Sequence, residues 1–60
     1  MTKEEMLKVA QIMTTAEEGC PVCSADLLRQ FVELFPEAAP AADMAWQQEF
    51  RGEDGDWRTR

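Results

Sequence analysis

Cys20 and Cys23 are the residues whose type and spacing most suggest chemistry, and they lie in the stretch EEGCPVCSADLL at residues 17–28. Proline favours the first position of a helix, where its missing N–H is no loss. If Pro21 occupies that position, Cys20 is the N-cap and Cys23 lies in the first turn. Both thiols then lie at the positive end of the helix dipole, which favours a thiolate. The motif therefore permits a redox pair, half of a metal site, or a turn with two packed thiols.

The redox interpretation has little support beyond the spacing and the helix start. A C-x-x-C pair is close enough to form a disulfide. Glu17 and Glu18 precede the motif, however, and their negative charge disfavours a neighbouring thiolate. The chain also lacks the alternation of strand and helix patterns that accompanies thioredoxin-type motifs, so that fold is excluded.

Zinc is the alternative cofactor. Structural zinc is held by four ligands, usually cysteine and histidine. The chain has two cysteines and no histidine, so Cys20 and Cys23 provide half of a site. A second copy could supply the other half across a two-fold axis, or Glu17, Glu18 or Asp26 could complete the site. We favour packed thiols and no cofactor, because cysteine commonly behaves as a small apolar residue.

The apolar periodicity predicts three helices and no strand. Along the first predicted helix, apolar residues recur every three to four positions from Met6 to Ala16, as on one helix face. Pro36 ends the second helix. The predicted helices span residues 3–18, 21–35 and 40–51. We therefore expect an all-α fold, a small three-helix domain built as a helical hairpin plus a third helix.

The expected domain covers residues 1–52, and residues 53–60 are expected to form a flexible polar tail. Trp57 is the exception in that tail, since a lone tryptophan in a polar segment often docks. The second helix is unusually rich in large apolar residues, and two short helices are not expected to cover its face. A helical-bundle homodimer would bury the surplus. The expected interface consists of Leu27, Leu28, Phe31, Val32 and Phe35 with Trp46 from the third helix.

The charge of the chain restricts its partners. Twelve acidic and six basic residues give a formal net charge of −6. Such a chain is repelled by phosphate backbones and anionic lipid, so direct nucleic-acid binding is not expected. The sequence contains no run of about 20 apolar residues, so no membrane span is expected. The N-terminus does not fit a secretion signal, which leaves a cytoplasmic location as the expectation.

These observations favour a small, acidic, non-enzymatic module for protein–protein interaction or accessory regulation. Its expected partner is a second copy, another protein, or both, and a basic surface would complement its charge. Sixty residues leave little room for a deep catalytic cavity. The first alternative is a thiol site at Cys20 and Cys23. The second alternative is an acidic mimic of nucleic acid.

Overall fold

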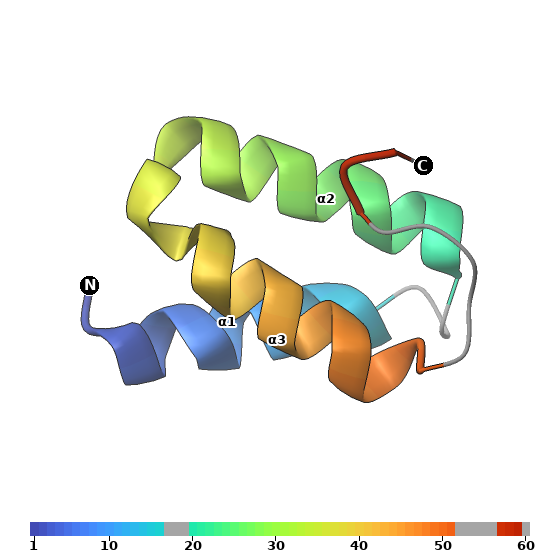
Figure 1. The fold of residues 1–60 in the computed structure, drawn as a ribbon, viewed down its shortest axis with the longest axis horizontal. Coiled ribbons are helices and arrows are strands. Elements are labelled where there is room, and N and C mark those ends of the chain that lie inside the picture. Colours follow the sequence, from blue (N-terminus) through green and yellow to red (C-terminus); the bar gives the residue numbers. More distant parts are fainter. Residues whose placement is uncertain (17–19, 52–56, 60) are drawn as a thin grey trace.

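The computed structural model describes residues 1–16, 20–51 and 57–59. These residues form three α-helices and one 3-10 turn, with no strand among them: α1 (Lys3–Thr15), α2 (Pro21–Leu34), η1 (Pro36–Ala38) and α3 (Ala39–Glu49). Helices α1 and α3 run in the same direction and α2 runs against them (Figure 1). The predicted all-α, three-helix domain is confirmed.

Local hydrogen bonds and prolines define where the helices begin and end. The Thr2 hydroxyl accepts the Glu5 N–H at 3.0 Å, and the Glu5 carboxylate accepts the Thr2 N–H at 2.8 Å, which closes a capping box. Helix α1 ends at Thr15, and residues 17 and 18 of the predicted helix lie outside the described part of the chain. Helix α2 ends at Leu34, because the residue before Pro36 is disfavoured in helical geometry.

Small side chains bring the helices together. The contact between α1 and α3 is the most extensive contact between any two elements. The buried alanines in the shared core are Ala10, Ala25, Ala38, Ala42 and Ala45. Because these side chains end at Cβ, the helix backbones can approach closely. The larger buried residues are Met6, Leu28, Phe31, Trp46 and Phe50.

Two polar residues are fully buried where α1 meets α2. The Ser24 hydroxyl donates to the Thr14 carbonyl at 3.3 Å, across the helix pair. The Thr14 hydroxyl donates to the Gln11 carbonyl at 2.9 Å, within its own helix. Both hydroxyls therefore have partners in the interior, which offsets the free-energy cost of burying them.

Trp57 joins the core from beyond the predicted domain boundary at residue 52. Its side chain is only 4% exposed. The indole N–H donates to the Asp43 carboxylate of α3 at 2.9 Å, and the backbone carbonyl accepts from the Arg29 guanidinium of α2 at 2.9 Å. Figure 1 shows this last segment lying along α2. Residues 53–56 and 60 of the predicted tail lie outside the described residues.

A cation completes this arrangement. The Arg58 guanidinium forms a double contact with the Asp43 carboxylate, at 2.6 and 3.3 Å, and lies 4.1 Å from the centre of the Trp57 ring. We call the four residues Arg29, Asp43, Trp57 and Arg58 the C-terminal clamp. The hydrogen bond from Arg58, assisted by that from Trp57, holds the pKa of Asp43 below its ordinary value although partial burial opposes the shift.

Removing the indole is expected to destabilise the fold. Trp57→Ala should lower the free energy of unfolding by about 3 kcal/mol, because it empties a buried aromatic site. Trp57→Phe keeps most of the ring but loses the hydrogen bond to Asp43, and should cost about 1 kcal/mol. Urea unfolding followed by far-UV circular dichroism measures both. Ile12→Ala, at a residue 64% exposed, is the control. A Trp57→Ala variant as stable as this control would contradict the packing.

The clamp should also make stability depend on pH. A carboxyl whose pKa is lower in the folded than in the unfolded chain stabilises the fold at pH values above its pKa in the unfolded chain, which is near 3.9. That stabilisation is lost as the pH falls through the pKa of the carboxyl in the folded chain. The contribution of Asp43 should thus be present at pH 7 and diminish below about pH 4. Urea unfolding measures the decrease in the free energy of unfolding between pH 7 and pH 3, and this decrease should be smaller for Asp43→Asn than for the wild type. Equal losses would show that Asp43 has no such role.

Candidate functional site

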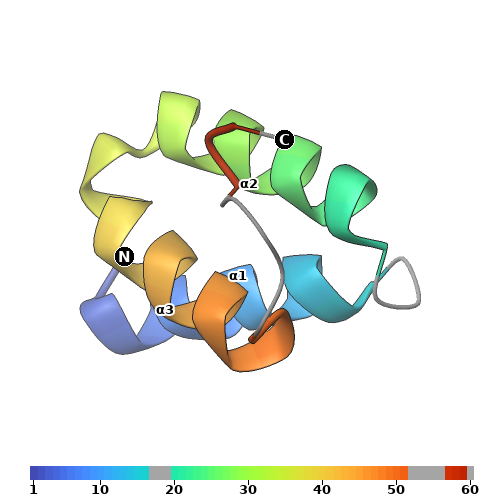
Figure 2. The same cartoon turned by 45° about the vertical axis from the view of Figure 1, so that its right-hand side comes forward.

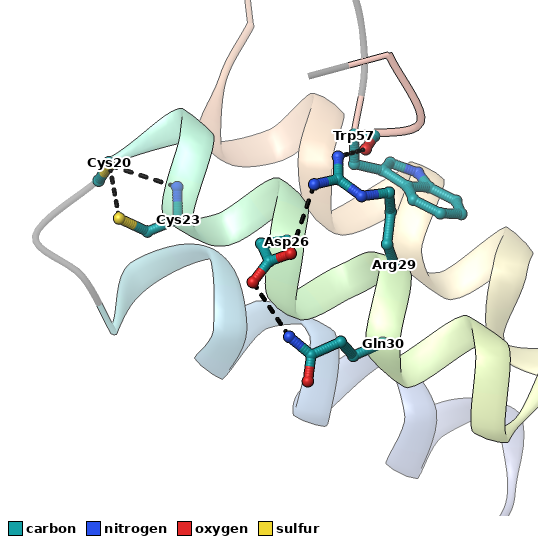
Figure 3. Close-up of polar contacts among 6 residues, drawn as sticks. All are labelled: Cys20, Cys23, Asp26, Arg29, Gln30 and Trp57. Atoms are coloured by element: carbon teal, nitrogen blue, oxygen red, sulfur yellow. Dashed lines mark hydrogen bonds and ion pairs between the residues drawn. The ribbon is translucent and has the colours of Figure 1, made fainter.

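The two cysteines meet at the start of α2. Cys20 is the N-cap and Pro21 the first helical residue, as predicted from the sequence. The Cys20 sulfur accepts the Cys23 N–H at 3.3 Å, and the two Sγ atoms lie 2.9 Å apart as a hydrogen-bonded thiol pair (Figure 3). The helix geometry therefore brings both sulfurs together at the positive end of the α2 dipole.

Neither cysteine belongs to the core. Cys20 is half-buried and Cys23 is exposed, and both are thiols in this structure. The interpretation of two packed thiols requires buried side chains, and the exposure of Cys23 does not fit it. The pair belongs to the first turn of α2, and the start of α2 lies at one end of the molecule, near the end of α1, in both ribbon views (Figure 2).

The described residues contain no group of three or more His, Cys, Asp or Glu side chains that could hold a metal ion. Within one chain, these residues therefore give Cys20 and Cys23 no third ligand. The carboxylate of Asp26 instead binds Gln30 at 3.0 Å and Arg29 at 3.4 Å (Figure 3). Glu17 and Glu18 lie outside the described residues. Zinc shared between two copies stays a prediction.

The predicted interface on α2 is largely used by the chain itself. Leu28, Phe31 and Trp46 are at most 5% exposed and belong to the core. Leu27 and Val32 are half-buried. The C-terminal end of α2 carries exposed apolar side chains, since Leu34 is 76% and Phe35 39% exposed. A partner could reach that end without opening the fold.

A groove that was not predicted lies between α1 and the η1–α3 segment. Its volume is about 380 Å³. The apolar residues that line it are Met6, Leu7, Pro40, Ala41 and Met44, and the charged ones are Lys3, Glu4 and Glu37. The sequence signal for the groove is the spacing of Pro40, Ala41 and Met44, which forms an apolar stripe on α3 distinct from the buried residues Ala42, Ala45 and Trp46.

The capping role of Cys20 can be tested by substitution. Cys20→Ser should leave the free energy of unfolding nearly unchanged, because a serine hydroxyl also accepts the Cys23 N–H. Cys20→Ala removes the acceptor and should cost about 1 kcal/mol. Urea unfolding under reducing conditions measures both, with Cys23→Ser as the control. If serine destabilises as much as alanine, Cys20 has a role that only sulfur fills.

Within the described residues, no helix has both the length and the apolar character needed to cross a membrane. Comparison of the chain with protein-family models, with curated proteins and with solved structures gave no match. The function is therefore argued from the groove and the cysteine pair themselves.

Proposed function

We propose that the protein is a small non-enzymatic binding module whose groove between α1 and α3 receives the apolar face of a basic amphipathic helix from another protein. The observation that carries this proposal is a groove of about 380 Å³ whose lining is mainly apolar and includes two acidic residues and one basic residue. Docking an amphipathic helix into an apolar groove is a recurrent mode of peptide recognition.

The lining of the groove suits an adaptable contact. Met44 is 51% exposed, and Met6 contributes to the floor from the core. Methionine side chains are flexible and polarisable, so they adjust to apolar side chains of different shapes. Pro40 and Ala41 contribute small apolar side chains to the lining. These features support binding of one or two apolar anchors rather than of an extended surface.

Charge favours a basic partner. Glu4 and Glu37 line the groove together with Lys3, and the whole chain carries a formal charge of −6. The Glu4–Lys8 pair, at 3.7 Å, is exposed to solvent and leaves Glu4 accessible. Lysine or arginine beside the apolar anchors would complement this field and accelerate association. A second acidic copy would be repelled, so a homodimer is the less favoured occupant.

Binding should depend on both the groove and the charge of the partner. The probe is a synthetic amphipathic helix with leucine anchors and lysine flanks, and its charge-reversed partner carries glutamate in place of lysine. Nuclear magnetic resonance titration should show shifts at Leu7, Ala41 and Met44 with the basic peptide and much smaller ones with the acidic peptide. Met44→Asp should weaken binding about tenfold, because it places a charge on the apolar floor.

The matched control is Ile12→Asp, which introduces the same charge at an exposed apolar residue of α1 outside the groove. It should bind the basic peptide as the wild type does. Equal binding of both peptides, or equal weakening by both substitutions, would refute groove recognition. Light scattering at high protein concentration tests the alternative: a dimer that Met44→Asp dissociates would make a second copy the occupant.

A further inference from the structure

We propose that Cys20 and Cys23 form a reversible dithiol–disulfide couple that exchanges with small-molecule disulfides of the glutathione class. This function is separate from groove binding. Three observations carry it: the 2.9 Å distance between the sulfurs, the N–H hydrogen bond to Cys20, and the access of solvent to the pair.

The pair is already arranged for a disulfide. A disulfide bond is about 2.05 Å long, so the sulfurs need to approach by only about 0.9 Å from their 2.9 Å separation. Both residues lie at the N-terminus of the 14-residue helix α2, in which Pro21 restricts the backbone between them. Oxidation therefore requires no rearrangement of the helices.

The hydrogen bonds assign different roles to the two thiols. Cys20 accepts the Cys23 N–H at the helix N-terminus, which favours its thiolate, the form that attacks disulfides. In the neutral pair the Cys20 S–H donates to the Cys23 sulfur at 2.9 Å. When Cys20 has lost that proton, the Cys23 S–H can rotate and donate to the Cys20 thiolate. We assign Cys20 as the attacking thiol and Cys23 as the resolving thiol.

The exchange proceeds in two displacement steps. The Cys20 thiolate attacks one sulfur of the external disulfide, forms a mixed disulfide and releases the first thiolate. Cys23, after losing its proton, attacks the Cys20 sulfur, closes the Cys20–Cys23 disulfide and releases the second thiolate. The two cysteines lose two electrons and two protons, and the external disulfide is reduced to two thiols.

The couple and the groove lie at opposite ends of the molecule. The cysteines lie in the first turn of α2, whereas the groove is lined by residues near the starts of α1 and α3. Figure 1 shows the start of α2 at the opposite end of the molecule from the starts of α1 and α3. Groove binding can be measured with both thiols reduced. Failure of either proposal is therefore distinguishable from failure of the other.

The test equilibrates the full chain in buffers of varied reduced-to-oxidised glutathione ratio, followed by acid quench, alkylation and intact-mass measurement. The wild type should pass from two alkylated thiols to none, as a monomer without bound glutathione, and reduction should reverse the change. The matched control combines Val22→Cys with Cys23→Ser, which keeps two thiols at a different spacing. It should require about a tenfold more oxidising ratio.

Single substitutions test the assigned order. Cys23→Ser should accumulate glutathione on Cys20 about tenfold faster than Cys20→Ser accumulates it on Cys23. The opposite order would overturn the assignment of the attacking thiol. Thiols that stay alkylatable at every ratio, or disulfide-linked dimers, would overturn the couple itself. A control that oxidises as readily as the wild type would show that the geometry at the start of α2 does not favour the disulfide.

Discussion

Burial of Trp57 between α2 and α3 is the interaction on which closure of this small core depends. These two helices contact each other much less than α1 contacts α3, and Trp57 bridges them: its backbone carbonyl accepts from Arg29 of α2, and its indole N–H donates to Asp43 of α3. A 60-residue chain buries only about 60% of its unfolded surface, so one large aromatic residue is a substantial share of its core. The indole N–H and the backbone carbonyl of Trp57 are hydrogen-bonded, which offsets the cost of burying them.

This closure changes which surfaces remain for partners. With Trp57 in place, the chain covers Leu28, Phe31 and Trp46 by itself. Accessible apolar side chains include Met44, in the lining of the groove, and Leu34 and Phe35 at the C-terminal end of α2. The interaction module that we propose is therefore built on a groove lined by α1 and α3, and the thiol pair is left at the far end of the bundle.

Local features were predictable because their causes are local. The capping box joins Thr2 to Glu5, and the cysteine N-cap joins Cys20 to Cys23, in both cases across three residues. Pro36 ends α2 through steric contact with its neighbour. The long-range contacts were not predictable in this way. The partner of Trp57 is Asp43, 14 residues away, and nothing in a polar tail specifies that carboxylate.

The sequence by itself determined the helices, their first turns and the proximity of the two thiols, since 3.6-residue periodicity and capping act within a few residues. Only the tertiary structure decided how the apolar faces are shared. Each of α2 and α3 carries more apolar surface than one neighbouring helix covers. The spacing of apolar residues along a helix does not predict which of its apolar sides becomes buried. Packing decided it: the alanines of α3 allow close approach to α1, Trp57 closes the gap to α2, and Met44 remains at the surface.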